Sequence, residues 1–258
     1  MIVNYKNTPI HLDQYGKGNA LFLIHGFLEE RNIWNELIPK LQENNLVICP
    51  DLFGHGETPV LSEVHTMEEM ADAVAFIMDE LKIESASLIG HSMGGYISMA
   101  FLEKYPERAD RIMLLNSSPK EDSAERLIER DQVIKIVPKH KQIFIKSAVT
   151  KLFAEESRIQ FEDKLNQRIE AAMKMEVNGI LAATKGMKIR KDREWVLKNH
   201  TGTKWIVAGE EDALIPIETL KNIAQNTDTK LVELPGGHMS YIEQREKVIK
   251  AIDQFLKQ

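Results

Sequence analysis

Short apolar runs of strand length recur along the chain, separated by stretches with helical periodicity. Runs of this kind, bounded by turn residues, are typical of strands buried on both faces of a sheet. They occupy residues 20–24, 46–49, 85–89, 111–115, 203–209 and 230–234. Residues 1–15 predict two further short strands around a turn at Asn7-Thr8-Pro9.

The stretches between these runs predict helices. The clearest is residues 66–81, where apolar side chains recur on one face and Thr66 forms a capping box with Glu69. Further helices are predicted at residues 33–42, 93–104, 217–225 and 240–256. Alternation of strand and helix predicts an α/β protein whose parallel sheet is covered by helices on both faces.

The alternation stops between about residues 119 and 202. This segment has only helical patterns, at residues 126–137, 142–153, 158–175 and 177–188. It is rich in neither Gly and Ser nor Pro, so it does not have the composition of a linker. We therefore expect a core formed by residues 1–118 and 203–258, with a helical insertion at 119–202.

Bulk composition narrows the class of protein. The 258 residues are 43% hydrophobic and 28% charged, and the net charge of −6 gives no reason to expect nucleic acid or an anionic membrane as partner. Cys49 is the only cysteine, so no disulfide framework or cysteine-rich metal site is expected. The start lacks the pattern of a signal peptide, and no apolar run approaches the ~20 residues of a membrane span. These features favour a cytoplasmic protein.

The strongest chemical signal is the sequence Gly90-His91-Ser92-Met93-Gly94. It lies between a predicted strand and a predicted helix, which is the context of a nucleophile elbow. A strand that turns directly into a helix strains the backbone at the corner and brings the two elements close together, so glycines are needed two positions either side. We therefore interpret Ser92 as a nucleophile.

A serine nucleophile needs a base, and the base needs an orienting carboxylate. In open α/β sheets the ligand site lies beyond the carboxyl ends of the strands. His238 follows the last predicted strand, and Asp212 follows the strand before it. The order Ser92, Asp212, His238 is that of hydrolases with this elbow. Asp212 is favoured over Glu210 and Glu211 because the strand must end before the carboxylate can turn toward His238.

Backbone amides complete the predicted site. The amide of Met93, directly after the nucleophile, and that of Phe27, after His25-Gly26, are positioned to bind an oxyanion. His91 adjoins the serine but is expected to point along the strand end. The other histidines are expected to be structural or to shape the pocket, as His25 and His55 do at strand ends: His11, His25, His55, His65, His140 and His200.

Taken together, these stretches resemble the α/β-hydrolase superfamily, in particular its small carboxylesterase-like and lactonase-like members. The resemblance rests on residues 25–27 (HGF), 51–56 (DLFGHG), 90–95 (GHSMGG), 182–187 (AATKGM), 209–212 (GEED) and 237–238 (GH). It implies an eight-stranded, mostly parallel sheet, a helical cap over the active site, and no cofactor. Glu57 departs from the pattern, since many relatives have a small residue there, and this leaves the role of its loop open.

The helical insertion is expected to determine which substrate fits. Candidate pocket residues are His25, Ile143, Phe144, Met173, Met187 and Met239. The apolar ones among them equally suit the insertion's own core, as does Ile180. Five lysines lie where no acid occurs between Asp131 and Glu155, and they either steer an anionic ester or form a solvated face: Lys135, Lys139, Lys141, Lys146 and Lys151.

The expected function is hydrolysis of a carboxylic ester, thioester or lactone through an acyl-enzyme, with a small-molecule ester as substrate. The same fold and residues also suit C–C bond hydrolysis, elimination in menaquinone synthesis, perhydrolysis, or a ligand-sensing receptor with vestigial hydrolysis. Fold and triad do not fix the reaction. No His-Glu-x-x-His or clustered ligand set indicates a metal site. The sequence does not distinguish a monomer from a homodimer.

Overall fold

The computed structural model describes residues 1–258 and contains one eight-stranded sheet. The strands lie in the order β1-β2-β4-β3-β5-β6-β7-β8. Strands β1 and β2 pair antiparallel, β2 pairs antiparallel with β4, and all other pairs are parallel. Their bounds are β1 (Ile2–Tyr5), β2 (Thr8–Tyr15), β3 (Asn19–Ile24), β4 (Asn45–Pro50), β5 (Ala86–His91), β6 (Ala109–Leu115), β7 (Thr203–Gly209) and β8 (Lys230–Leu234). The predicted fold class is confirmed.

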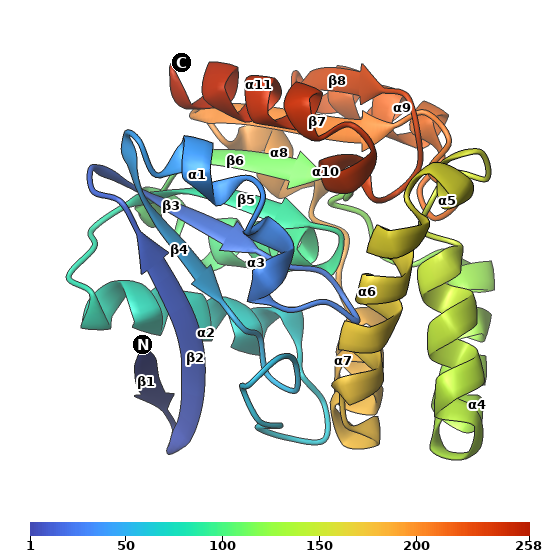
Figure 1. The fold of residues 1–258 in the computed structure, drawn as a ribbon. Coiled ribbons are helices and arrows are strands. Elements are labelled where there is room, and N and C mark those ends of the chain that lie inside the picture. The colour runs from blue at the N-terminus through green and yellow to red at the C-terminus, as the bar shows by residue number, and fades with distance from the viewer.

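Helices cover both faces of this sheet (Figure 1). On β3, Phe22 and Ile24 point into the layer of α2 and α3, whereas Leu21 and Leu23 point into the layer of α1 and α11. This alternation of two apolar side-chain sets explains why the strand has a continuous apolar sequence. The core helices are η1 (Arg31–Trp34), α1 (Ile38–Leu41), α2 (Met67–Glu80), α3 (Met93–Lys104), η2 (Pro106–Arg108), α9 (Ile217–Thr227), α10 (Ser240–Glu243) and α11 (Arg245–Leu256).

Two core helices differ from their predictions. The single helix expected at residues 33–42 is wrong, because the chain forms η1 and then the one-turn α1. Pro39 accounts for the interruption: it has no amide hydrogen to bond to the carbonyl of Asn35, and its ring would clash with that carbonyl. The helix expected at 240–256 is divided into α10 and α11 at Gln244, whose φ and ψ are −132° and 38°. Half of the predicted capping box is present: the Thr66 hydroxyl accepts a hydrogen bond from the Glu69 amide, but the Glu69 carboxylate contacts Lys6 and Ser62 in place of the Thr66 amide.

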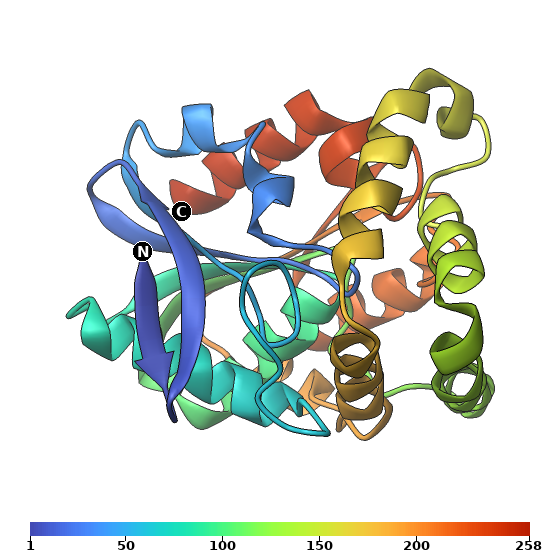
Figure 2. The ribbon, with the colours of Figure 1, turned by 60° about the horizontal axis from the view of Figure 1, so that its bottom comes forward.

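The segment between β6 and β7 contains only helices: α4 (Ala124–Thr150), α5 (Ser157–Gln160), α6 (Glu162–Lys174), α7 (Val177–Lys188) and α8 (Glu194–Asn199). Figure 2 shows α4, α6 and α7 grouped beyond one end of the sheet. The arrowheads of the parallel strands point toward that end in Figure 1. Helix α4 contains Pro138 and a non-helical residue, His140, so it consists of two arms. The predicted break between residues 137 and 142 corresponds to this kink.

The last helix of the segment packs on the core. Helix α8, which the sequence did not predict, contacts α3 and α9, whereas α4 contacts α6 and α7. It is preceded by Arg193, which is 1% exposed and pairs with Glu68 of α2 and Glu103 of α3. The Arg193 amide also donates to the Pro119 carbonyl, so the two ends of the segment between β6 and β7 meet there.

None of the helices is both long enough and apolar enough to span a bilayer.

The corner between β5 and α3 is close-packed on both sides. A Cβ atom on Gly90 would lie 2.3 Å from the carbonyl oxygen of Gly94, and one on Gly94 would lie 2.1 Å from the carbonyl oxygen of Ile24. Real Cβ atoms do not approach backbone atoms this closely, so glycine is required at both positions, as the motif indicated.

We expect Gly94→Ala to destabilise the protein by about 2–3 kcal/mol, because α3 must move away from β3 to admit the methyl group. Urea denaturation followed by circular dichroism measures this change. The control Lys104→Ala, at the exposed end of the same helix, should change stability by less than about 1 kcal/mol. Equal effects of the two substitutions would contradict the packing argument.

Candidate active site

Ser92 lies at the corner between β5 and α3. Its φ and ψ are 50° and −115°, a region that side-chain-bearing residues rarely adopt and that costs about 1–3 kcal/mol. The corner is held by neighbours from the next strand. The Ser92 amide donates to the Leu115 carbonyl, and the Ser117 hydroxyl donates to the Ser92 carbonyl at 2.7 Å. These bonds hold the side chain of Ser92 at the carboxyl edge of the sheet.

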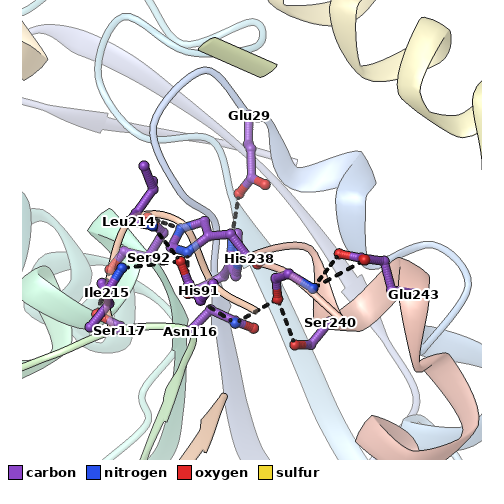
Figure 3. Close-up of polar contacts among 12 residues, drawn as sticks. Glu29, His91, Ser92, Asn116, Ser117, Leu214, Ile215, His238, Ser240 and Glu243 are labelled. Atoms are coloured by element: carbon purple, nitrogen blue, oxygen red, sulfur yellow. Dashed lines mark hydrogen bonds and ion pairs between the residues drawn. The ribbon is translucent and has the colours of Figure 1, made fainter. Parts of the chain in front are cut away.

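His238 links Ser92 to Asp212. Figure 3 shows His238 beside Ser92. The Nδ1 atom of His238 lies 2.6 Å from Asp212 Oδ2, and its Nε2 atom lies 2.8 Å from Ser92 Oγ. An ionised carboxylate only accepts hydrogen bonds, so Nδ1 carries the proton. In the neutral ring Nε2 is then the acceptor, and the Ser92 hydroxyl donates to it. The structure therefore brings together the three residues predicted from the sequence, in the arrangement expected of a nucleophile, a base and an orienting acid.

The Asp212 carboxylate is buried, and both of its oxygens accept hydrogen bonds. Its Oδ1 atom accepts hydrogen bonds from the amides of Leu214 and Ile215, at 2.8 and 3.1 Å. Burial raises the pKa of Asp212, but the His238 imidazole and these two amides outweigh burial and hold the pKa below its usual value. The competing acids Glu210 and Glu211 are exposed to solvent. The preference for Asp212 therefore agrees with the geometry.

Asn116 is a supporting residue for which the sequence predicted no role. It follows β6, and its Nδ2 group donates to Asp212 Oδ2 and to the Gly237 carbonyl, both at 3.2 Å. Its backbone amide donates to the Val207 carbonyl at 2.7 Å. Asn116 thus ties together the loops that carry Asp212 and His238. Its position directly after a strand, on the edge where the other site residues lie, was the available signal.

The loop after β3 lies directly against Ser92. A Cβ atom on Gly26 would come within 3.1 Å of the Ser92 Cβ atom, and Phe27 and Ser92 line the same cavity. Among the turn and loop hydrogen bonds, the amides of Phe27 and Met93 donate to no acceptor. Both amides are therefore available at the place where the sequence predicted an oxyanion site.

A buried glutamate connects this loop to the elbow. Glu29 Oε2 accepts from the Gly26 amide at 2.6 Å and contacts His91 Nδ1 at 2.8 Å, while Glu29 Oε1 accepts from the Tyr241 hydroxyl at 2.9 Å. The other ring nitrogen of His91 contacts the His238 carbonyl at 2.9 Å. One carboxylate thus links the predicted oxyanion loop, the elbow and the His238 loop.

The same contacts set the charge of His91. Its two partners, the Glu29 carboxylate and a carbonyl, only accept hydrogen bonds, so both ring nitrogens must carry protons. Burial lowers the pKa of His91, but Glu29 more than offsets this effect and the pKa is raised. Burial likewise raises the pKa of Glu29, yet His91 and the Gly26 amide bring it down to about 2. His91 and Glu29 therefore form a buried ion pair beside Ser92. The sequence did not predict this role for either residue.

A cavity of about 420 Å³ opens above Ser92 and His238. Its walls come from the loop after β3, from α4 and from α7. Of the predicted pocket residues, Phe144 and Met187 line it, but four do not: His25, Ile143, Met173 and Met239. Ile143 is 71% exposed to solvent, Met239 is buried, and Met173 packs against the apolar core beneath. Helical periodicity alone did not distinguish the cavity face of α4 from its solvent face.

His25 instead crosslinks two strand ends. Its Nε2 atom accepts a hydrogen bond from the Leu52 amide at 3.0 Å, which requires a neutral ring. Burial lowers the pKa of His25 and so favours that form. His25 is fully buried, and its ring lies 5.1 Å from that of His55 in a tilted arrangement. Its prediction as a pocket residue is therefore corrected to a structural role below the cavity.

Glu57, whose loop was left open, joins an ion cluster. Asp51 accepts hydrogen bonds from the amides of Arg31 and Glu57, at 2.8 and 2.9 Å, and also pairs with the Arg31 guanidinium. Glu57 pairs with the same guanidinium. A Cβ atom on Gly56 would overlap the Asp51 carboxylate, at 2.2 Å. The loop is thus folded around Asp51, and Glu57 contributes to that fold from the surface.

The lysines of α4, together with Lys151 at its C-terminal cap, have several environments. Lys151 lines the cavity, whereas Lys141 donates to the carbonyls of Met173 and Met175 at the end of α6. Lys135, Lys139 and Lys146 do not line the cavity. No group of three or more His, Cys, Asp or Glu side chains is arranged to hold a metal ion.

Comparisons with known proteins agree with this architecture. The sequence model of the α/β-hydrolase fold family matches residues 19–244. The chain is 29% identical over 245 residues to the dihydrolipoyllysine-residue acetyltransferase component of the acetoin cleaving system of Pseudomonas putida, covering 93% of this chain. It spans only 64% of the length of that relative.

Two further similarities extend over nearly the whole of both chains. The 2-hydroxy-6-oxo-2,4-heptadienoate hydrolase of Pseudomonas putida is 26% identical over 263 residues, covering 95% of this chain and 92% of that protein. The structure of a thermophilic esterase from Thermogutta terrifontis with malate bound is similar, with a TM-score of 0.92 and 30% identity over 97% of this chain and 93% of the other. This chain belongs to the α/β-hydrolase fold family, which is a family of hydrolases.

The buried pair predicts a pH-dependent stability difference between the wild type and Glu29→Gln. At pH 7 the substitution should cost about 3–5 kcal/mol, because it leaves His91 without its buried counter-charge. Glu29 has its pKa lowered from 4.5 to about 2, so its contribution is complete above pH 4.5 and is lost as pH falls toward 2. His91 has a raised pKa, so its contribution is present below 6.5 and is lost as pH rises through the raised value.

Urea denaturation of both proteins between pH 3 and 9 measures this difference. Glu36→Gln is the matched control, because Glu36 is an ion-pairing glutamate at the surface, where a salt bridge contributes about 0–1 kcal/mol. A difference between wild type and Glu29→Gln that stays constant across the range would contradict the assignment of charges.

Proposed function

We propose that this chain is a serine hydrolase that cleaves carboxylic esters through an acyl-enzyme. The observation that carries the proposal is the hydrogen-bonded series Asp212–His238–Ser92 at the floor of the cavity, beside two free amides. The similarity to the Thermogutta terrifontis esterase over nearly the whole of both chains supports the ester as the bond cleaved. The fold itself supports many reactions, so the site carries the argument.

In the first half of the reaction Ser92 Oγ attacks the ester carbonyl carbon, and His238 Nε2 takes the hydroxyl proton. The carbonyl oxygen becomes an oxyanion, to which the amides of Phe27 and Met93 donate. Asp212 holds the ring in the tautomer that accepts the proton and stabilises the resulting imidazolium. The tetrahedral intermediate then collapses, the bond to the alcohol oxygen breaks, and His238 gives its proton to that oxygen. The alcohol leaves, and the acyl group remains on Ser92.

In the second half, water attacks the acyl carbon while His238 Nε2 accepts one of its protons. The same two amides bind the second oxyanion. When this intermediate collapses, the bond to Ser92 Oγ breaks and His238 returns the proton to the serine. The products are a carboxylic acid and an alcohol, and the enzyme regains its starting state. This route needs no cofactor.

The helical segment is proposed to act as a cap that shapes the substrate site. Apolar side chains of α4 and α7, among them Val133, Phe144 and Met187, line the cavity together with Phe27. Such walls would exclude water from the acyl-enzyme and bind the non-reacting part of the ester by its apolar surface.

A second candidate is hydrolysis of a C–C bond. It is favoured by the similarity to the 2-hydroxy-6-oxo-2,4-heptadienoate hydrolase, which covers 95% of this chain. The two candidates are separated by comparing kcat/KM for 4-nitrophenyl acetate and butyrate with kcat/KM for 2-hydroxy-6-oxo-2,4-heptadienoate. We expect the esters to be the better substrates. A dienoate value tenfold or more above both esters would replace ester hydrolysis with C–C hydrolysis.

We expect Ser92→Ala to reduce kcat for 4-nitrophenyl butyrate by at least about 10⁴-fold, because no nucleophile remains. The control is Ser98→Ala in the same helix, whose buried hydroxyl donates only to the Gly94 carbonyl of its own helix. It should retain wild-type turnover within about threefold. Turnover by Ser92→Ala that equals the wild type would disprove the proposed nucleophile.

Asp212→Asn should lower kcat by about 10⁴-fold while leaving the protein folded, because an amide favours the wrong tautomer of His238. Steady-state kinetics and circular dichroism, measured on the same sample, separate loss of chemistry from loss of fold. The role assigned to Asp212 fails if the folded variant keeps more than a tenth of wild-type kcat.

A further inference from the structure

Arg130 is an incompletely satisfied guanidinium on the wall of the cavity. It belongs to the first arm of α4, is 9% exposed and lines the cavity that contains Ser92. Its Nε atom donates to Asp122 Oδ2 at 3.1 Å, and its two terminal nitrogens donate to no protein atom. Neither of these nitrogens is completely enclosed by protein atoms, so both are accessible. They are therefore free to bind a group that enters the cavity.

Its counter-ion is shared with a second arginine. Arg190 Nη1 lies 2.6 Å from Asp122 Oδ1, so two guanidinium groups are balanced by one carboxylate. Arg190 is otherwise satisfied, because it donates to the carbonyls of Lys120 and Met187 and stacks 4.0 Å over the Tyr96 ring. The two arginines therefore share one uncompensated positive charge, and Arg130 is the one with unused donors.

The neighbouring side chains do not remove this surplus. Arg126 lies four residues before Arg130 and also lines the cavity, and like charges at this spacing destabilise a helix. Arg126 is paired with Glu129, the one carboxylate that α4 itself adds to the cavity wall. Burial lowers the pKa of Arg130, and repulsion by Arg126 adds to this effect despite Asp122.

The other acid on the cavity wall is already neutralised. Glu29 accepts hydrogen bonds from Gly26, His91 and Tyr241, and its charge is balanced by His91. Lys151 adds a further positive charge and has no ion-pair partner in the structure. The cavity walls therefore carry a net positive charge, while the whole chain carries a net charge of −6.

We propose that the ester cleaved in this cavity carries a carboxylate and that the terminal N–H groups of Arg130 bind it. The proposal rests on the ester hydrolysis proposed above and names the class of ester. A planar carboxylate matches two parallel donors of a guanidinium, and a substrate anion would supply the counter-charge that α4 lacks. The carboxylate takes no part in the bond changes at Ser92. The products are therefore a free acid and an alcohol, one of which keeps the carboxylate of the substrate.

A structural role for Arg130 would look different. The buried Arg193 uses its guanidinium to join Glu68 and Glu103 from two helices, and Arg190 joins Asp122 to two backbone carbonyls. Arg130 makes one bond and leaves its terminal nitrogens unused at the cavity. An apolar ester would leave these groups desolvated without a partner, which is costly for a charged group.

The test compares esters that differ by one carboxylate. In the first pair, phenyl acetate is neutral and 4-acetoxybenzoate carries a carboxylate on the alcohol part. In the second pair, ethyl hexanoate is neutral and monoethyl adipate carries a carboxylate on the acyl part. The measured quantity is the ratio of kcat/KM for the charged ester to that for its neutral partner. Comparing this ratio between variants removes differences in intrinsic reactivity.

We expect Arg130→Gln to lower the ratio about 10- to 100-fold for one of the two pairs, mainly through KM for the charged ester, as for loss of a charge-assisted hydrogen bond. The pair that responds identifies the side of the ester that carries the carboxylate. Arg130→Lys should recover part of the ratio, because it keeps the charge. Lys188→Gln is the control: it also removes a cation paired with an aspartate of this segment, Asp131, but Lys188 does not line the cavity. The proposal would be overturned if, for both pairs, the ratio measured with Arg130→Gln lies within twofold of the wild-type ratio.

A binding measurement separates this proposal from the ester hydrolysis on which it rests. Glutarate should raise the Tm of Ser92→Ala in a saturable manner and should not raise that of the double variant Ser92→Ala/Arg130→Gln. If glutarate stabilises only the protein with Arg130 but Ser92 proves irrelevant to ester cleavage, the anion site stands and the proposed reaction fails. If Ser92-dependent ester cleavage holds but glutarate has no Arg130-dependent effect, the anion site fails alone.

Discussion

The strained backbone at Ser92 is the constraint on which the rest of this structure depends. A side-chain-bearing residue with φ of 50° and ψ of −115° persists only where its surroundings hold it in place. Here a strand, a helix and the adjacent strand all contribute, through glycines that allow close approach and through the hydrogen bonds from the Ser92 amide to Leu115 and from the Ser117 hydroxyl to Ser92. The energy stored at one residue is offset by packing that extends across the middle of the sheet.

Two buried polar residues, Glu29 and Asn116, hold the loops around Ser92 in place by hydrogen bonds. Glu29 joins the loop after β3 to His91, and His91 reaches the His238 carbonyl. On the other side, Asn116 joins Asp212 to Gly237. The proposed nucleophile, base, acid and oxyanion donors therefore lie on four loops whose relative positions are fixed by buried hydrogen bonds. Preorganisation of this kind avoids the energy of rearranging dipoles during the reaction.

Much of this arrangement could be predicted from the sequence, because it depends on local rules. Apolar runs located the strands, a strand-to-helix corner with flanking glycines located Ser92, and positions after strand ends located Asp212 and His238. The supporting contacts could not be predicted in this way. Glu29 and His91 are 62 residues apart and meet only after the sheet has formed. The cavity face of α4 was also missed, because a kink at His140 and packing on α6 and α7 decide which side chains point inward. Arg130 and Phe144 share that inner face, although one is charged and the other aromatic.

The kink in α4 also has a consequence for how such enzymes diversify. The arm after His140 leads to Leu152, whose carbonyl accepts a hydrogen bond from the His238 amide, so this arm is coupled to the proposed base. The arm before it carries Arg126, Arg130 and Ile136 on the cavity wall and shares no hydrogen bond with Ser92, Asp212 or His238. Mutation can therefore alter the first arm, and with it the range of molecules accepted, at little risk to the reaction chemistry. The second arm also lines the cavity, through Phe144, but changes there act on the His238 loop as well.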